Sequence, residues 1–371
     1  MIEFTVKKFD LLKELTFTQG VVEKKATIPI LQNVMLEAEA ERLLIVATDL
    51  EIGIRTLCDA KLKSPGALTV PAKRFFDIVR AMPDAEIKFK AQENNWATVT
   101  CQKSSFKLVG TATDNFPAMA EFKHPLVTIP ARMLARMIDR TIFAISAEES
   151  RYTLNGALLL LKPDSMTMVA TDGHRLAHIE QTHEFTGLNT ELRALIPKKA
   201  MGELTRLLGE ADEKATVEMG KDENHLFFKL GNRLLVSRML SGQFPNYEAV
   251  LPRENEKNVS VGREEFLSAL RRVSLLSDER SHAIKLNVGA QKLEISSSHA
   301  DYGEAHDEME VDYSGTPLEV GFNGQYLLEF LSVIHEDKVS FEFKDEQSAG
   351  LLRPINEEGI NYRYIVMPMR I

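Results

Sequence analysis

The sequence predicts an α+β protein of three similar domains, each an antiparallel sheet with two helices. The same order of strand-like and helix-like patterns recurs three times along the 371 residues. Leu11, Leu134 and Leu267 hold matching positions, so the period is close to a third of the chain, far longer than the units of solenoids or propellers. Short apolar runs separated by turn signals indicate hairpins. We expect domains at residues 1–123, 124–252 and 253–371.

Each copy opens with a short β-like run followed by an amphipathic helix, and it repeats this pairing later. The first pairs are Glu3–Val6 with Lys7–Leu15, Leu126–Ile129 with Ala131–Phe143, and Asn258–Val261 with Arg263–Leu276. The second pairs are Leu68–Val70 with Ala72–Met82, Ala194–Ile196 with Lys198–Leu208, and Leu318–Gly321 with Gly324–Ile334. Apolar residues three or four apart give each helix one stripe to bury.

Alternating or wholly apolar runs between these helices predict the remaining strands. They are Leu43–Ala47, Ala85–Lys90, Ala97–Cys101, Ser105–Val109, Ala157–Leu161, Thr167–Ala170, Thr216–Met219, His225–Leu230, Arg233–Ser237, Ala283–Val288, Lys292–Ser296, Val339–Phe343 and Arg363–Met367. We expect antiparallel sheets with helices on one face. Thr113–Lys123 and Gly242–Lys257 each contain a Phe-Pro pair, and they predict extended linkers because proline restricts the residue before it.

The composition is typical of a soluble, cytoplasmic globular protein. The chain is 44% hydrophobic and 27% charged. It has no apolar run near the roughly 18 residues of a membrane span, and its N-terminus alternates like a strand rather than a signal peptide. Cys58 and Cys101 lie far apart without metal-binding spacing, so we expect both to be reduced and buried. No metal or cofactor is expected.

Charge is divided between the helices and the rest of the chain. The net charge is −9, which by itself disfavours nucleic acid. Within five of the six expected helices, however, Lys and Arg outnumber Asp and Glu. If these helices share a face, that face attracts phosphates without reading bases. The alternative is that Lys and Arg simply cover solvated helix surfaces.

Several motifs occur in a fixed order along the chain. The most specific is Ala170-Thr171-Asp172-Gly173-His174-Arg175-Leu176-Ala177. Others are Pro29-Ile30-Leu31-Gln32-Asn33, Thr48-Asp49-Leu50-Glu51, Val70-Pro71-Ala72-Lys73-Arg74-Phe75-Phe76, Arg151-Tyr152-Thr153-Leu154-Asn155-Gly156, Gln243-Phe244-Pro245-Asn246-Tyr247 and Tyr364-Ile365-Val366-Met367-Pro368-Met369-Arg370-Ile371. With these motifs the chain resembles, from end to end, the bacterial DNA polymerase III β subunit family, the replicative sliding clamps.

The resemblance implies the DNA-clamp fold and a non-catalytic role. Two chains would close head to tail into a homodimeric ring, with helices inside and sheets outside. The ring would encircle double-stranded DNA without reading its sequence and act as a processivity factor in DNA replication. Implied partners are the DNA polymerase III catalytic subunit, the clamp loader, and other DNA polymerases and repair proteins that carry clamp-binding motifs. No membrane is implied.

The resemblance also implies a hydrophobic pocket for partner peptides. Its expected residues are Leu154, Thr171, Gly173, His174, Arg175, Leu176, Pro245, Val250, Val366, Met367, Pro368 and Met369. Arg151, Tyr152, Asn323 and Arg370 are expected at its rim. Apolar, adaptable walls with a few orienting polar groups suit a peptide groove. The alternative for the C-terminal motif is an ordinary strand packed in the core.

Contacts to DNA are implied for basic residues that match the family. These are Lys25, Arg74, Arg151, Lys198 and Lys199, with Arg136, Arg140 and Arg271 as weaker candidates. Lys25 stands where the family usually has arginine, and lysine lacks the bidentate fork. Thr153 stands where many relatives have a second aromatic residue, so no stacking role follows for it.

Ring closure is implied through one strand edge in the first domain and one in the third. Phe106 and Leu108 match the first side, and Leu275 and Leu276 match the second. Pairing between chains would satisfy edges that a lone sheet must protect. The alternative is that all four side chains belong to domain cores.

The sequence also allows two other function classes. Asp172 and His174, with Ser150 or Thr171, could form a hydrolase site, or Asp172, His174 and His178 could bind a metal. Neither a G-x-S-x-G elbow nor an H-E-x-x-H motif supports them. Leu176-Ala177-His178-Ile179 is typical of a strand, which would keep His174 and His178 apart. A scaffold of repeated domains with no DNA role is the third class, and the basic helices argue against it.

Overall fold

The computed structural model describes residues 1–23, 27–39, 41–252, 255–356 and 358–370. Lys25, one of the expected DNA contacts, lies outside these residues. The chain divides into two compact units, one of Met1–Ala135 with Lys199–Met239 and one of Arg136–Lys198 with Leu240–Ile371. Each unit is built around an eight-stranded sheet that joins strands far apart in the sequence.

The first unit contains two antiparallel sheets. The five-stranded sheet has the order β5 (Lys61–Ser64), β1 (Glu3–Lys7), β7 (Glu86–Ala91), β8 (Trp96–Cys101) and β9 (Ser104–Val109). The eight-stranded sheet has the order β10 (Val127–Pro130), β15 (Thr216–Lys221), β16 (His225–Leu230), β17 (Arg233–Arg238), β4 (Ile52–Asp59), β3 (Arg42–Thr48), β2 (Asn33–Glu39) and β6 (Gly66–Pro71). It is continuous because β4 pairs antiparallel with β17.

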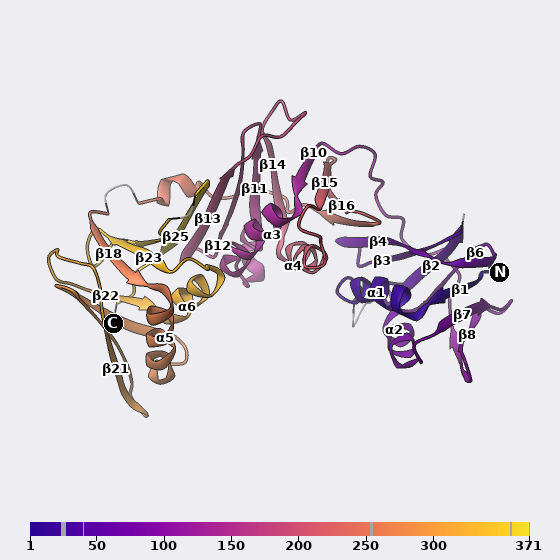
Figure 1. Cartoon of the computed structure of the whole chain (residues 1–371), viewed down its shortest axis with the longest axis horizontal. Helices are drawn as coiled ribbons and strands as arrows, with labels where there is room; N and C mark the ends of the chain where they lie inside the picture. Colours follow the sequence, from indigo (N-terminus) through magenta and orange to yellow (C-terminus); the bar gives the residue numbers. More distant parts are fainter. Residues whose placement is uncertain (24–26, 40, 253–254, 357, 371) are drawn as a thin grey trace. The chain divides into compact units, whose positions relative to one another are not determined.

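Helices α1 (Lys8–Thr18) and α2 (Ala72–Ala81) pack on this first unit (Figure 1). Helix α2 buries Ala72, Phe75 and Val79, which recur at helical spacing. Phe75 meets Phe89 of β7 edge to face, with ring centroids 5.8 Å apart. The opposite side of the helix exposes Lys73 and Arg74. The buried stripe therefore fixes which way these cations point.

The second unit has the same plan. Its eight-stranded sheet has the order β14 (Leu192–Pro197), β11 (Gly156–Lys162), β12 (Ser165–Thr171), β13 (Arg175–Thr182), β25 (Ile360–Val366), β24 (Gly350–Pro354), β23 (Lys338–Phe343) and β18 (Lys257–Gly262). Its four-stranded sheet has the order β21 (Gly303–Glu310), β20 (Lys292–His299), β19 (Ala283–Gly289) and β22 (Leu318–Asn323). Strands β13 and β25 lie side by side, in purple and yellow in Figure 1.

The six predicted helices are present, and their first residues agree with the sequence patterns to within one position. Helix α3 spans Ala131–Asp139, α4 Lys198–Leu208, α5 Arg263–Val273 and α6 Gly324–Val333. The predicted ends of α3 and α5 lay three or four residues too far, because short 3₁₀ turns at Ile142–Ala144 and Ser274–Leu276 continue the apolar spacing. The predicted end of α1 lay three residues too early, and those of α2 and α6 one residue too far.

The two linkers differ. Residues 113–123 form neither helix nor strand, as predicted. The second linker, expected to be extended throughout, contains a 3₁₀ turn at Tyr247–Val250, so that expectation was wrong there. Both cysteines are free and buried, as predicted, and burial raises the pKa of Cys58 to about 12. Among the described residues, no helix is long and apolar enough to cross a membrane.

Candidate partner-binding pocket and charged surfaces

The turn between β12 and β13 is fixed by its own side chains. Asp172 Oδ1 accepts hydrogen bonds from the backbone N–H groups of His174 at 2.9 Å and Arg175 at 3.0 Å. Thr171 Oγ1 donates to the Arg175 carbonyl at 2.6 Å and accepts from Gly173 N at 3.1 Å. Gly173 has a φ of +90°, which favours glycine. The motif of the sequence is therefore a closed turn whose Asp172 carboxylate is fully engaged.

Arg175 ties this turn to the rest of the second unit. Its side chain is 7% exposed and pairs with Asp172 Oδ2 at 3.0 Å and with Glu329 of α6. Its Nη2 donates to the Phe143 carbonyl at 2.7 Å, and the guanidinium lies 4.2 Å from the Tyr326 ring centroid. Burial alone would lower the pKa of Arg175, but Tyr364 and Glu329 outweigh it and hold the pKa above its usual range. Because so little of the Arg175 side chain is exposed, a ligand in the pocket could contact only a small part of it.

The C-terminal segment lies against the same turn. In β25, Val366 pairs with Arg175, and Met367 N donates to the His174 carbonyl at 2.9 Å. Met369 N then donates to the Gly321 carbonyl at 2.8 Å. Val366 is fully buried, whereas Met367 is 41% exposed. The C-terminal segment is thus more than a core strand, because Met367, the residue after β25, lies at the surface.

A cavity of about 140 Å³ opens beside this turn. Its lining is mostly apolar and comes from the 3₁₀ segment Glu149–Leu154, from β12, β13 and the turn between them, from the second linker, and from β25 with the residue after it. The lining residues are Leu154, Thr171, Gly173, His174, Arg175, Leu176, Pro245, Asn246, Tyr247, Val250, Ile365 and Met367. Nine of the twelve residues expected from the sequence are among them. Such a lining offers a socket for an apolar side chain with polar groups at its edge.

Three expected pocket residues lie elsewhere, and three lining residues were missed. Val366, Pro368 and Met369 do not line this cavity, because the chain turns away into the Gly321 bridge. Asn246, Tyr247 and Ile365 do line it. The signal for Tyr247 was its place in the motif after Phe244-Pro245, but the predicted extended linker hid the turn that brings it there.

Tyr247 covers a buried histidine. Its ring centroid is 5.6 Å from that of His178, and His178 Nδ1 is buried without a hydrogen-bond partner among the described residues. Burial, with a smaller contribution from Arg363, lowers the pKa of His178 to about 4. His178 is therefore neutral at physiological pH and supports the pocket wall from behind.

The expected rim residues have separate local roles. Arg151 donates to the Asp172 carbonyl at 2.9 Å and pairs with Glu148 at 3.0 Å. Tyr152 is 57% exposed, and Arg370 is also exposed. Asn323 caps α6, where its Oδ1 accepts from Gln325 N and Tyr326 N, a standard N-cap arrangement. None of the four contributes to the lining of the cavity.

The expected DNA contacts differ in how exposed their charges are. Arg74 and Lys198 are exposed, as is Arg271. Lys199 is 42% exposed but forms an ion pair with the buried Asp49. Arg136 is half-buried. Arg140, a weaker candidate, is buried and pairs with Glu336 at 2.8 Å, so an accessible phosphate contact at that residue was a wrong expectation.

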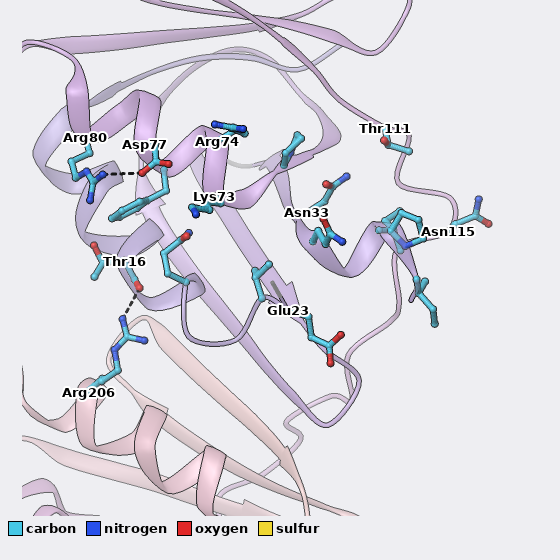
Figure 2. A pocket seen from close by; sticks show the side chains of 18 residues that line it. Thr16, Glu23, Asn33, Lys73, Arg74, Asp77, Arg80, Thr111, Asn115 and Arg206 are labelled. Atoms are coloured by element: carbon cyan, nitrogen blue, oxygen red, sulfur yellow. Dashed lines mark hydrogen bonds and ion pairs between the residues drawn. The ribbon is translucent and has the colours of Figure 1, made fainter. Parts of the chain in front are cut away.

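Arg74 borders the groove of the first unit that Figure 2 shows. This groove has a volume of about 1140 Å³, and Lys73, Arg80 and Arg206 also line it. Two of these cations are already engaged: Arg80 pairs with Asp77 at 2.9 Å, and Arg206 donates to the Thr16 carbonyl at 2.9 Å. Lys73 and Arg74 therefore contribute most to the positive field of the groove.

The expected closure residues lie near sheet edges. Strand β9 ends the five-stranded sheet, and β21 ends the four-stranded sheet. Phe106 on β9 is 39% exposed, and Leu275 is 82% exposed. Leu108 is half-buried against the core of the first unit, and Leu276 is also half-buried. The two more exposed side chains are thus the stronger interface candidates.

Comparison with known proteins identifies the family. Models of the DNA polymerase III beta subunit match its N-terminal domain at residues 2–120, its central domain at 128–246 and its C-terminal domain at 248–370. The chain belongs to the DNA polymerase III beta subunit family. The three-domain α+β fold predicted from the repeats is thereby confirmed, while the exact boundaries stay a prediction.

Full-length relatives are named beta sliding clamps. That of Pseudomonas aeruginosa is 36% identical, and that of Chlamydia muridarum 32% identical, each over 99–100% of both chains. Among solved structures, a Bartonella birtlesii sliding clamp bound to griselimycin has a TM-score of 0.95 at 33% identity, with complete coverage of both chains. A Pseudomonas aeruginosa clamp bound to griselimycin has a TM-score of 0.93 at 34% identity and the same coverage. The sliding-clamp function expected from the motifs, and with it a part in DNA replication, is therefore confirmed.

Proposed function

We propose that this chain forms half of a closed ring that encircles duplex DNA and tethers the replicative polymerase through the apolar pocket. The observation that carries the proposal is the pocket itself, a cavity between a rigid turn and the C-terminal strand in a member of the sliding-clamp family. Tethering replaces diffusion with a local concentration that reaches millimolar values. This role requires no chemistry from the chain, and the engaged Asp172 carboxylate offers no catalytic base.

The pocket would hold short peptide segments of the polymerase III catalytic subunit, the clamp loader, and other polymerases and repair proteins. Leu154, Leu176 and Met367 supply apolar walls, and methionine adapts to different side chains. The exposed His174 supplies a polar contact at the mouth. Because two relatives were solved with griselimycin, we propose the same compound as a probe for this chain.

The test compares the full chain with one truncated after Val366. Removing residues 367–371 deletes Met367 from the pocket while keeping β25. We expect the truncated chain to lose both griselimycin and the polymerase catalytic subunit in calorimetric titrations. Tyr302→Ala, at an exposed side chain outside the pocket, is the matched control and should bind as the parent does. Undiminished binding by the truncated chain would refute the pocket.

The ring would contact DNA through exposed cations on its helices. Arg74 on α2 and Lys198 on α4 are exposed, whereas Arg151 and Lys199 are held in ion pairs. Phosphate contacts of this kind position a duplex without reading its sequence, which suits sliding. Reversal of Arg74 and Lys198 to Glu should shorten retention on DNA, and Lys162→Glu at an exposed hairpin should not. Equal retention of both variants would contradict the basic lining.

Two chains would close the ring by joining β9 of one to β21 of the other. Strand β9 and its preceding turn expose Lys103 and Lys107, while β21 exposes Glu304, Glu308 and Glu310. Opposite charges on the two unpaired edges favour pairing in this orientation. Leu275→Asp should yield a monomer in analytical ultracentrifugation, because it places a charge in the joint. A dimer of parental stability in that variant would contradict this joint.

A further inference from the structure

The first unit contains a second copy of the turn that forms the pocket. Asp49 Oδ1 accepts from Glu51 N at 2.9 Å and Ile52 N at 2.7 Å. Thr48 Oγ1 donates to the Ile52 carbonyl at 2.9 Å and accepts from Leu50 N at 3.0 Å. Leu50 has a φ of +78°, the counterpart of Gly173 at +90°. The four hydrogen bonds that Thr171 Oγ1 and Asp172 Oδ1 form thus each have a match in the turn at residues 48–52.

The surrounding strands repeat as well. The residue opposite Thr48 is Gly53, and the residue opposite Thr171 is Leu176. Arg238 N donates to the Glu51 carbonyl at 2.7 Å, as Met367 N does to the His174 carbonyl at 2.9 Å. The two turns therefore sit at equivalent places in their eight-stranded sheets. What differs is the set of side chains around them.

The difference is concentrated at one contact. A Cβ atom built on Gly53 would lie 2.8 Å from Met119 Cε and 3.0 Å from Met119 Sδ, so the thioether rests directly on the glycine backbone. Met119 comes three residues after Phe116 in its linker, just as Tyr247 comes three residues after Phe244. In the second unit the equivalent linker residue borders an open cavity. In the first unit the linker residue Met119 instead fills the space beside Gly53 and the turn at residues 48–52, which we call the closed corner.

We infer that Met119 is an internal occupant of a second peptide site, and that its thioether takes the place of a partner's apolar side chain. The inference rests on the proposed peptide-binding role of the pocket. Met119 is half-buried and methionine is unbranched and flexible, so its side chain can leave the corner without disturbing a core. With Met119 gone, Gly53 offers a bare wall to a short peptide with one large apolar side chain.

The charges at this corner set the chemistry of that peptide. Glu51 and Arg238, both exposed, stand where the pocket has His174 and Met367. The site would therefore favour an apolar side chain flanked by charged residues, and it would bind more weakly than the pocket. One chain thus presents one open and one self-filled site, which limits it to one partner peptide.

The test is a titration of four full-length proteins with a synthetic peptide that carries one leucine and one phenylalanine between charged residues. The proteins are the parent, Met119→Ala, Met367→Asp and the double variant. We expect one peptide per chain for the parent, two for Met119→Ala, none for Met367→Asp and one for the double variant. The second site should be at least tenfold weaker than the first.

Two further variants keep the test decisive. Gly53→Ala puts a methyl group on the wall that would receive the peptide, so adding it to Met119→Ala should return the count to one peptide per chain. Met119→Leu keeps the site filled and should also give one. One peptide per chain in Met119→Ala, or two in Met119→Ala combined with Gly53→Ala, would overturn the inference. If the parent binds none, the proposed pocket fails, whereas a gain in Met119→Ala over the parent still supports the internal occupant.

Discussion

The turns at residues 48–52 and 171–175 share a backbone and differ in what surrounds them. Both close with the same Asp and Thr hydrogen bonds. In the second unit Arg175 holds the turn and Leu176 and Met367 line a cavity. In the first unit Ile52 replaces the arginine and Met119 rests on Gly53. The repeated turn therefore provides the same backbone in both units, and a few surrounding side chains determine whether a cavity for a partner peptide forms beside it.

The largest expected effect separates the two aspartates. Asp172→Ala removes a partner of the buried Arg175 guanidinium and leaves two backbone N–H groups unbonded, so we expect a loss of about 4 kcal/mol of unfolding free energy. Asp49→Ala leaves the same number of backbone N–H groups unbonded, but its ion-pair partner Lys199 is 42% exposed and can be rehydrated, so the loss should be only about 2 kcal/mol. Chemical denaturation of both variants measures the difference. Equal losses would contradict the distinct anchoring of the two turns.

The second effect is a pH dependence of the stability against unfolding. His178 lies three residues after Arg175 and is buried, whereas Arg55, three residues after Ile52, is exposed. The folded-state pKa of His178 is about 4, below its unfolded value, so the unfolded chain binds more protons and stability falls as pH drops from about 6.5 to 4. The expected contribution is about 3 kcal/mol.

Thermal melting across this range tests that expectation. His178→Phe should melt with a flatter pH dependence than the parent, while Arg55→Ala should keep the parental profile. If His178→Phe shows the same slope as the parent, the histidine does not carry the effect.

The third effect concerns binding at matched positions. Met367→Asp places a carboxylate at the apolar cavity, and we expect griselimycin affinity to fall about thirtyfold, or about 2 kcal/mol. Arg238→Asp makes the same change in the closed corner and should leave affinity as it is. Calorimetric titration of both variants shows whether griselimycin binds only at the pocket. A comparable loss of griselimycin affinity in Arg238→Asp would contradict this.

The smallest effect concerns adjacent lysines. Lys199 forms an ion pair with Asp49, whereas Lys198 is exposed. Lys198→Gln should lower the salt dependence of DNA affinity by about one phosphate contact. Lys199→Gln should change DNA affinity less and cost up to about 1 kcal/mol of stability. The salt slopes of the two variants, measured on the same duplex, provide the check.

Much of the fold could be predicted because its patterns are strong. The helices begin where apolar spacing and chain order repeat, and α4 matches its predicted range in full. Strand β21 was missed because its sequence GEAHDEME has little apolar alternation, and it forms by pairing with β20. The pairing of β4 with β17 and of β13 with β25 could not be predicted from local sequence patterns, because the paired strands lie far apart in the sequence.

The site was predictable as a set of motifs but not as a geometry. Asp172-Gly173 is typical of a turn, but the hydrogen bonds by which Thr171 and Asp172 close this turn are known only from the structure. The sequence could not show that Val366 points into the core while Met367 is exposed. Nor could it show that Arg140 is buried against Glu336, because an arginine near a helix end is exposed in most proteins. Such outcomes depend on packing partners from distant segments.

In the proposed ring, the link between protein and DNA is topological. The most direct measurement loads the chain onto nicked circular plasmid with the cognate clamp loader and ATP, and follows retention before and after the plasmid is linearised. We predict retention on the circle and rapid loss from the cut ends, because a sliding ring is held by topology. Equal retention on circular and linear DNA would mean direct adhesion and would contradict the claim.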